Sequence, residues 1–458
     1  MTEAAINPNI FREYDVRGVV ARDLGPATTE ALGRAYGSLV AETGGRRVSV
    51  GMDVRTTSPK LAEALIRGIR KSGLEVVRLG VVPTPLVYFS VVHLNLDGGV
   101  QITGSHNPIE YNGFKMMLGR ESLHGEGIRG LRERITAGRF QEGAGSVEDV
   151  DLNGVYLDAL AAAAELRRPL KLVIDAGNGC ASRLAPALFR RLGCEVEELY
   201  CTFDGTFPHH IPDPTLPETL DALRERVLTT GADLGLAYDG DADRLGALDE
   251  RGRILWGDQL LALFSRRVLA DHPGAEILCE VKCSRALLED VESHGGRPVM
   301  TRTGHSLIKK AMRETGAPLA GEMSGHMFFA DWHGFDDGIY ASLRLAHLVA
   351  SGDRSLGRLV DDLPRYHATP EIRLDCDDER KFEVVEAVLR RFRRTHAVND
   401  LDGARIEFPG GWGLVRASNT QPVLVLRAEG ATPGERDAIE AALRGVLTGL
   451  GVEAAGRS

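Results

Sequence analysis

Three aspartates at alternate positions are the feature of this chain best suited to metal chemistry. They are Asp239, Asp241 and Asp243 in the stretch AYDGDADR. In an extended strand their side chains would share one face but span ~13 Å, and in a helix neighbouring ones would point apart. A curled loop, which Gly240 permits, can bring three carboxylates to one ion. Such a set of oxygen ligands suits Mg²⁺, which is usually held by a few carboxylates and a phosphate oxygen.

Other interpretations of these aspartates are weaker. A calcium-binding EF-hand loop counted from Asp239 would end at Glu250, but its sixth position is Arg244, where glycine is needed. A phosphatase with an aspartate nucleophile usually carries Thr or Val where Asp243 stands. Taken alone, the motif also remains compatible with a solvated acidic turn.

The stretch TGSHNP places Ser105 in a segment that favours a tight turn. Gly104 and Asn107 tolerate positive φ, and the proline that follows disfavours a helix. The segment is therefore either an ordinary turn or an exposed loop that presents Ser105 as a nucleophile. A serine hydrolase is disfavoured, because the nucleophile-elbow pattern needs glycine where Thr103 and Asn107 stand.

Two more loops gather polar side chains directly after apolar runs. Each of them alone could be an ordinary polar turn. The first, GEMSGH, contains Glu322, Ser324 and His326, and the second, RASNTQP, contains Arg416, Ser418, Asn419 and Thr420.

Composition limits the classes of partner and compartment. The chain has 458 residues, enough for about three or four globular domains. Its net charge of −10 disfavours nucleic acid and membranes as partners, because those surfaces need basic side chains. No signal peptide and no run of ~20 apolar residues is visible, and six cysteines show no disulfide spacing. We therefore expect a cytoplasmic protein with reduced thiols, either monomeric or weakly homo-oligomeric.

Short apolar strands alternate with helical stretches along most of the chain, as in LKLVIDAGNG and SPKLAEALIRGIRKSG. This alternation predicts an α/β fold with largely parallel strands, and the last quarter predicts a small α+β module. Polar, glycine-rich stretches indicate the boundaries. The expected domains are 1–150 with the serine loop, 151–253 with the aspartates, 254–366 with GEMSGH and 367–458 with RASNTQP.

Taken together, the four loops resemble the α-D-phosphohexomutase superfamily, specifically its bacterial phosphomannomutase/phosphoglucomutase branch. The resemblance covers the whole chain in the same order. It implies three α/β domains of similar topology and a fourth resembling the TATA-binding-protein fold, arranged around a central active-site cleft. It also implies an enzyme that interconverts the 1- and 6-phosphates of mannose and glucose through a phosphoserine and a hexose 1,6-bisphosphate.

The resemblance assigns roles position by position. Ser105 becomes the phosphorylated serine beside His106, and the three aspartates would hold Mg²⁺ with a phosphoserine oxygen as a further ligand. GEMSGH would read the sugar, and RASNT would grip the phosphate that is not transferred. Shorter matches add Tyr14 and Arg17 in EYDVRG, Lys115 in YNGFK, Lys282 in EVKC and His305 in RTGHS.

The chemistry is consistent with these roles. A phosphoserine adds roughly −1.5 to −2 charges beside three carboxylates, which one Mg²⁺ cannot neutralise. Arg244, Lys282 and Arg17 are the candidates for the remaining positive charge. Lys115 and His305 are the candidates for general base and acid, although the sequence leaves open whether His305 only caps a helix.

Two alternatives remain beside this assignment. A phosphoglucosamine mutase of the same superfamily is the closer one, and Met323 disfavours it, since that branch typically carries Gln there. A non-catalytic metal- or sugar-binding module is the more distant one. The expected ligands are phosphosugars and Mg²⁺, with glucose 1,6-bisphosphate as activator and intermediate.

Overall fold

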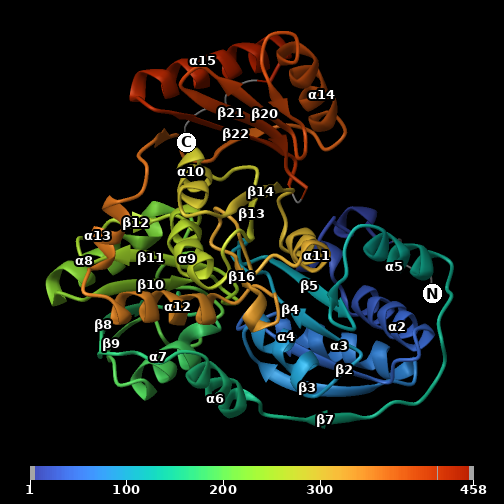
Figure 1. Ribbon diagram of the computed structural model, residues 1–458. Helices are drawn as coiled ribbons and strands as arrows, with labels where there is room; N and C mark the ends of the chain where they lie inside the picture. The colour runs from blue at the N-terminus through green and yellow to red at the C-terminus, as the bar shows by residue number, and fades with distance from the viewer. Residues whose placement is uncertain (1–5, 420, 453–458) are drawn as a thin grey trace. The chain divides into compact units, whose positions relative to one another are not determined.

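The computed structural model describes residues 6–419 and 421–452 of the chain. Its backbone contacts define two compact units, each built from two separate stretches of sequence. Unit 1 contains Met1–Leu260 and Ser324–Asp361, and unit 2 contains Leu261–Met323 and Asp362–Ser458. Figure 1 shows the elements with the labels used below.

The first sheet of unit 1 has the strand order β1-β5-β4-β2-β3-β7, with β6 paired to β5. Strand β2 is parallel to β3 and β4, whereas β5 is antiparallel to β4 and β1. The strands are β1 (Val16–Val19), β2 (Arg47–Met52), β3 (Glu75–Val81), β4 (Gly98–Ile102), β5 (Tyr111–Leu118), β6 (Glu121–Ser122) and β7 (Val147–Asp149). The helices are η1 (Pro8–Ile10), α1 (Val20–Asp23), α2 (Pro26–Glu42), α3 (Ser58–Lys71), α4 (Thr84–His93) and α5 (Glu126–Thr136).

Helix α3 illustrates how the sequence builds this sheet's core. Leu61, Leu65 and Ile69 recur every four residues, so they share one helical face, and all three are buried. They join apolar residues of α2, α5, β2, β4 and β5 in one cluster. The loops at the strand ends are therefore mounted on a packed core.

The second sheet of unit 1 has the order β12-β11-β10-β8-β9. Strand β8 is parallel to β9 and β10, and β11 is antiparallel to β10. The strands are β8 (Lys171–Asp175), β9 (Glu195–Leu199), β10 (Leu234–Tyr238), β11 (Leu245–Asp249) and β12 (Ile254–Leu255). The remaining elements of the unit are α6 (Asn153–Ala163), α7 (Ala181–Arg191), η2 (Pro217–Leu220), α8 (Asp221–Thr230), β16 (Met327–Phe329), η3 (Ala330–Trp332), α12 (Gly338–Ser351) and α13 (Leu356–Asp361).

Unit 2 contains a parallel group of strands and a separate antiparallel sheet. In the parallel group, β13 lies between β14 and β15. Its elements are α9 (Gly257–Asp271), which begins in unit 1, β13 (Glu276–Glu280), α10 (Arg285–Ser293), β14 (Arg297–Thr301), α11 (His305–Thr315) and β15 (Leu319–Gly321). Helix α10 begins after Ser284, whose hydroxyl accepts from the backbone N–H of Ala286.

The C-terminal sheet has the order β17-β22-β21-β20-β19, with β18 paired to β22. Every strand pair in it is antiparallel. Helices α14 and α15 pack against it (Figure 1), and α15 begins with a capping box between Thr432 and Glu435. The elements are β17 (His367–Ala368), β18 (Ile372–Asp375), α14 (Lys381–Phe392), β19 (Val398–Asn399), β20 (Ala404–Phe408), β21 (Gly411–Ala417), β22 (Val423–Gly430) and α15 (Pro433–Gly449).

The three α/β groups repeat one strand order, β4-β2-β3, β10-β8-β9 and β15-β13-β14. In each group, the strand that comes first in the sequence (β2, β8 or β13) lies between the other two. This confirms the predicted fold class of three similar α/β domains followed by an α+β domain. The exact domain boundaries and the arrangement around a central cleft stay predictions. Among the described residues, no helix combines the length and apolarity needed to span a bilayer.

Candidate active site

Three of the four sequence-predicted loops occupy the same place in the repeated strand order. The serine loop (residues 103–108) follows β4, the aspartate loop (239–244) follows β10 and the sugar loop (321–326) follows β15. Each loop therefore leaves the carboxyl end of the third strand of its group, where α/β folds hold ligands. The phosphate loop (416–420) instead joins β21 to β22.

Ser105 adopts the tight turn that its sequence predicted, with a φ of +48°. Its backbone N–H donates to the Thr103 hydroxyl at 2.7 Å, and its own hydroxyl donates to Asp239 Oδ2 at 2.6 Å. His106 lies beside it, with 3.0 Å between Ser105 Oγ and His106 Nδ1. The expectation of an exposed loop is wrong, because Gly240 packs against the carbonyl of Ser105 and the serine is only 2% exposed.

The three aspartates come together as a buried cluster. Each can offer one carboxylate oxygen within 4.8 Å of the others. Lys115, on β5, donates from Nζ to Asp241 Oδ2 at 2.7 Å and also forms an ion pair with Asp243. The curled loop that the sequence predicted is therefore observed, with a lysine from the neighbouring sheet against it.

Burial and mutual repulsion shift the ionisation of this cluster. Burial raises the pKa of Asp239 well above its usual range, and the charges of Asp241 and Asp243 raise it further. Burial also opposes the charge of Asp241, but the neighbouring Lys115 prevails and lowers that pKa. The pKa of Lys115 is raised by the same carboxylates against its burial, so the lysine stays protonated.

The aspartate loop fits a hard divalent cation. Asp241 Oδ1 and Asp243 Oδ1 are buried and have no hydrogen-bond partner among the residues that the structure describes. Lys115 contacts two of the carboxylates, and Arg244 Nε lies 4.0 Å from the third, so three carboxylates face two cations. Oxygen donors without thiolate or imidazole among the three favour Mg²⁺ or a similar ion over Zn²⁺.

Arg244 and His326 meet beside the aspartates within unit 1. Arg244 Nε donates to His326 Nε2 at 2.9 Å, which assigns the imidazole proton to Nδ1. That nitrogen lies 2.9 Å from Asp336 Oδ2 and 3.6 Å from Asp243 Oδ1. Sequence analysis missed Asp336, because the pair Asp336–Asp337 before α12 resembles an ordinary helix cap, which Asp337 does form.

Of the remaining predicted residues of unit 1, Arg17 and Tyr14 lie on or directly before β1 of the first sheet. Arg17 is on β1, the strand paired with β5, and its Nη2 donates to Asp15 Oδ2 at 2.6 Å. Tyr14 precedes the same strand and is buried. Ser324 belongs to unit 1 with His326, whereas Glu322, two residues earlier, belongs to unit 2. The sugar loop thus crosses from one unit to the other.

Lys282 is the main predicted cation of the α/β part of unit 2. Its Nζ lies 3.0 Å from Glu371 Oε2 and 3.7 Å from Glu280 Oε1. Burial opposes its charge, but the two carboxylates raise its pKa above the usual value. Lys282 in turn lowers the pKa of Glu371 to about 2, whereas burial raises the pKa of Glu280.

Two buried carboxylates fix the loops around Lys282. Glu322 Oε1 accepts from the backbone N–H of Gly304 at 2.7 Å. Glu280 accepts from the Thr303 hydroxyl at 2.8 Å and from the backbone N–H of Met323 at 3.3 Å. Glu322 therefore has a structural contact besides its predicted role with the sugar, and Glu280 was not predicted at all.

His305 is the first residue of α11 and is 9% exposed. The N-cap is Gly304, with a φ of +129°, so His305 stands one position inside the helix and not at its cap. The alternative that His305 merely caps the helix is therefore wrong. Its role as an acid or base stays a prediction.

Arg416 is the next-to-last residue of β21, and its guanidinium forms an ion pair with a carboxylate. Its Nη2 lies 3.1 Å from Asp402 Oδ2, and the same oxygen accepts from the backbone N–H of Thr303 at 3.0 Å. Ser418 Oγ accepts from the backbone N–H of Gln421 at 3.2 Å. Asn419 follows in the phosphate loop, and Thr420 lies outside the described residues.

Sequence models of the phosphoglucomutase/phosphomannomutase family match four successive ranges of the chain. Its α/β/α domains I, II and III match residues 8–142, 154–252 and 256–366, and its C-terminal domain matches residues 371–446. The chain belongs to the phosphoglucomutase/phosphomannomutase family. The predicted superfamily and its bacterial branch are thereby confirmed.

Relatives within the phosphoglucomutase/phosphomannomutase family span nearly the whole chain. The phosphomannomutase/phosphoglucomutase of Pseudomonas aeruginosa is 46% identical over 96% of this chain and 95% of its own. The phosphoglucomutase of Neisseria gonorrhoeae is 42% identical over 97% of this chain and 98% of its own. The crystal structure of a phosphoglucomutase/phosphomannomutase family protein from Burkholderia thailandensis is 42% identical, with a TM-score of 0.92 over 98% of this chain and 99% of that one.

Membership of the phosphoglucomutase/phosphomannomutase family identifies the protein as an enzyme, as predicted. The names of these relatives support the hexose phosphate branch and do not support the phosphoglucosamine mutase alternative. They leave the individual site residues untested, so the roles of those residues stay predictions.

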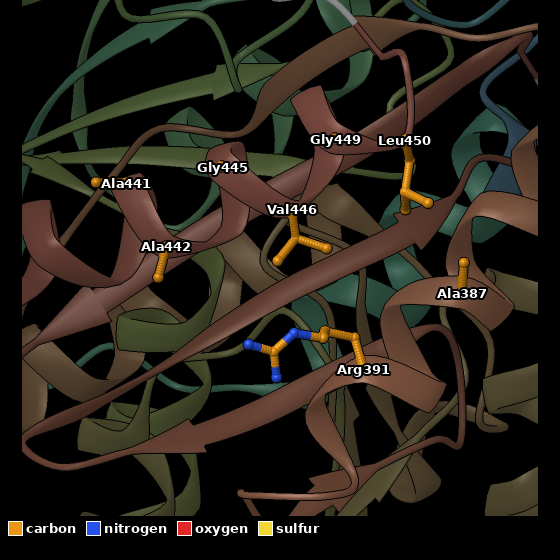
Figure 2. Close-up of a pocket in the computed structure, with 8 residues that line it drawn as sticks. All are labelled: Ala387, Arg391, Ala441, Ala442, Gly445, Val446, Gly449 and Leu450. Carbon is orange, nitrogen blue, oxygen red and sulfur yellow. The ribbon is translucent and has the colours of Figure 1, made fainter.

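One pocket of about 450 Å³ lies on helices α14 and α15 of unit 2, as Figure 2 shows. Small and apolar side chains line it together with a single charged residue, Arg391. It shares no residue with the four loops. We assign no chemistry to it.

Proposed function

We propose that this enzyme interconverts the 1- and 6-phosphates of mannose and glucose by passing a phosphoryl group through Ser105. The contact of 2.6 Å between the Ser105 hydroxyl and Asp239 supports this proposal most directly. It places the only predicted nucleophile against the only predicted metal loop. A phosphoserine there would meet the cation that the carboxylates require.

In the first half-reaction, the free hydroxyl of a hexose monophosphate attacks the phosphorus of phospho-Ser105. A P–O bond forms to the sugar, the P–O bond to Ser105 breaks, and the hydroxyl proton leaves while the serine oxygen gains one. The product is a hexose 1,6-bisphosphate. The bisphosphate then rotates by a half-turn, so that its other phosphate faces Ser105. That phosphate is transferred to Ser105, and the isomeric monophosphate is released.

The groups of unit 1 supply positioning and charge for this transfer. Asp239, Asp241 and Asp243 would hold Mg²⁺, which would offset charge on the phosphoryl oxygens. Lys115, ion-paired with Asp241 and Asp243, adds a positive charge beside the cluster and stays a candidate for general base. Arg244 adds a second cation beside Asp239, with 4.0 Å between Nε and Oδ2.

The groups of unit 2 would hold the part of the substrate that does not react. Arg416 presents a guanidinium that can bind a phosphate through two parallel hydrogen bonds, and Ser418 and Asn419 add polar groups beside it. Lys282 adds positive charge, and Glu322 would contact sugar hydroxyls that mannose and glucose share. Ser324, the other residue predicted to contact them, belongs to unit 1. His305 remains the candidate for proton transfer.

The test is to assay the 1-phosphates of mannose, glucose and glucosamine side by side, with glucose 1,6-bisphosphate as activator. Efficiencies for mannose and glucose should lie within about tenfold, a difference of ~1.4 kcal/mol, because the predicted contacts do not include C2. Intact-protein mass spectrometry should find one phosphate, on Ser105. A clear preference for glucosamine, or phosphate on another residue, would refute the proposal.

A further inference from the structure

Arg55, which no sequence motif pointed to, underlies the serine loop in unit 1. It follows β2 and its side chain is 1% exposed. Its Nη2 donates to the carbonyls of Ser105 at 2.9 Å and Asn107 at 2.6 Å, and its Nη1 donates to those of Pro108 at 2.8 Å and Tyr111 at 3.1 Å. One guanidinium therefore binds four carbonyls between Ser105 and the start of β5.

Asp53 completes this support from the other side of the loop. Its Oδ2 accepts from the backbone N–H of Gly104 at 3.0 Å and lies 3.3 Å from Arg55 Nε. Its Oδ1 accepts from the backbone N–H of Arg55 at 2.9 Å and from the Ser58 hydroxyl. A Cβ on Gly104 would lie 2.4 Å from the guanidinium carbon, so the loop and Arg55 are in direct contact.

The loop between β9 and η2 of unit 1 also packs against Arg55. The Phe207 ring lies over the guanidinium, with 5.3 Å from its centroid to Cζ. A Cβ on Gly205 would lie 2.1 Å from the carbonyl of Val54, so this loop closely approaches the backbone beside Arg55. The guanidinium thus lies between the serine loop and the loop that follows β9.

Ser105 needs such support, because its φ of +48° lies in the left-handed region, which is strained for an L-residue. Phosphoryl transfer depends mainly on in-line positioning, and a misplacement of about 1 Å can cost ~10²-fold in rate. Arginine offers five N–H donors in a fixed fork, whereas lysine offers three on a flexible stem. Only arginine can match four carbonyls at once.

We propose that Arg55, backed by Asp53, is a positioning residue that holds Ser105 in the orientation needed for phosphoryl transfer. This inference rests on the proposed function of Ser105 as phosphoryl carrier. Arg55 is buried beneath the loop, so it sets the rate of transfer without contributing to substrate binding. Its loss should lower kcat and leave KM nearly unchanged.

The experiment compares Arg55→Lys with Arg405→Lys. Arg405 is a matched control, because it is also 1% exposed and also donates to loop carbonyls, those of Val281 and Cys283 on either side of Lys282. Arg55→Lys should lower kcat by roughly 10- to 100-fold with KM within about threefold. Arg405→Lys should chiefly raise KM, because it disturbs the backbone on either side of Lys282, a predicted substrate-binding residue.

A second pair of variants covers the case in which Arg55→Lys does not fold, which circular dichroism and thermal unfolding would reveal. Asp53→Asn keeps the shape of the carboxylate, and Gly104→Ala displaces the guanidinium without removing it. Both should show the same loss of kcat at constant KM. The ³¹P resonance of phospho-Ser105 should also shift or broaden in the folded variants, which a general loss of stability would not cause.

The outcomes separate this inference from the proposed function. If wild-type enzyme carries no phosphate on Ser105 and turns over no hexose phosphate, the proposed function itself is wrong. If wild type is phosphorylated and active, but the folded variants keep wild-type kcat and an unchanged ³¹P resonance, only the role of Arg55 is refuted. A rise in KM equal to that of Arg405→Lys would refute it as well.

Discussion

The two units differ in the balance of negative and positive side chains at their predicted functional loops. In unit 1, one of three clustered, buried aspartates accepts from the serine hydroxyl, and one lysine contacts the other two. In unit 2, each predicted cation is paired with a carboxylate, Lys282 with the half-buried Glu371 and Arg416 with Asp402. Unit 1 thus has an excess of anions that a metal ion would neutralise, whereas unit 2 presents oriented cations that suit an anionic substrate.

This difference arises on similar frameworks. The serine, aspartate and sugar loops all follow the third strand of a repeated α/β group, so topology alone does not distinguish their functions. Residue type makes the distinction, because a cluster of carboxylates attracts a cation and a guanidinium attracts a phosphate. The comparison therefore predicts that unit 1 governs kcat and unit 2 governs substrate binding.

The largest expected effect is that of Ser105→Ala compared with Ser418→Ala. The first removes the phosphoryl carrier and should abolish nearly all turnover while the fold is kept. The second removes one hydroxyl predicted to bind phosphate, and should raise KM by about tenfold or less, the value of a single hydrogen bond. Steady-state kinetics on both variants checks this, and comparable losses of kcat would remove the distinction between the units.

Removal of metal should have the next largest effect, and only on the chemistry of unit 1. Chelation should lower kcat by more than ~10²-fold, and Mg²⁺ should restore it better than the larger Ca²⁺. Asp241→Asn should resemble partial chelation. Isothermal titration calorimetry of hexose 6-phosphate should show nearly unchanged affinity after chelation. Full activity in metal-free enzyme would contradict the assignment of the aspartate loop.

Arg416→Ala should have a smaller effect than metal removal, and it should change KM rather than kcat. Loss of a charge-assisted contact worth ~1.5–3 kcal/mol should raise KM by roughly 10- to 100-fold and weaken the hold on the bisphosphate. Escape of the intermediate would leave Ser105 unphosphorylated, so the variant should depend more on added glucose 1,6-bisphosphate. Rapid-quench measurements decide this. A slow first transfer at saturating substrate, without more leakage, would place Arg416 in the chemical step.

Sequence analysis identified the residues at the loop tips but not those that support them. Ser105 and the three aspartates stand in short motifs, so their chemistry can be recognised from residue types and spacing. Arg55 and Asp336 stand in no such motif, and the loop residues that they contact, Ser105 and His326, lie at least 10 positions away along the chain. Their function depends on which strands become neighbours.

The burial of the predicted loops could not be predicted from the sequence either. Glycine and asparagine correctly indicated the turn at Ser105, but they could not show that Gly240 packs on that turn. Likewise, Glu322 could be assigned to the sugar from its motif, whereas its bond to the N–H of Gly304 required the structure. Local conformation is encoded in adjacent residues, while coverage by another loop depends on the tertiary fold.

The smallest expected effect concerns the ion pair of Lys282 with Glu371, which tests whether the cations of unit 2 are held in place by carboxylates. The pKa of Glu371 is lowered to about 2 in the folded protein, mainly by Lys282. A lowered pKa means that its stabilising effect is present above the ordinary value of about 4.5 and is lost as the pH falls towards 2. Glu371→Gln should therefore be destabilised by about 1–3 kcal/mol at pH 7, with a smaller difference from wild type at pH 3.5.

Glu280→Gln is the matched control, since Glu280 faces the same lysine but its pKa is raised by burial. A raised pKa gives the opposite sign, because the stabilising effect of the protonated form is present below about 4.5 and is lost as the pH rises through the folded value. Relative to Glu280→Gln, wild type should therefore gain stability on acidification, whereas relative to Glu371→Gln it should lose stability. Urea unfolding of the three proteins at pH 7 and pH 3.5 measures both differences. If the two differences change in the same direction with pH, Glu280 and Glu371 titrate alike. The inference that their pKa values shift in opposite directions is then refuted.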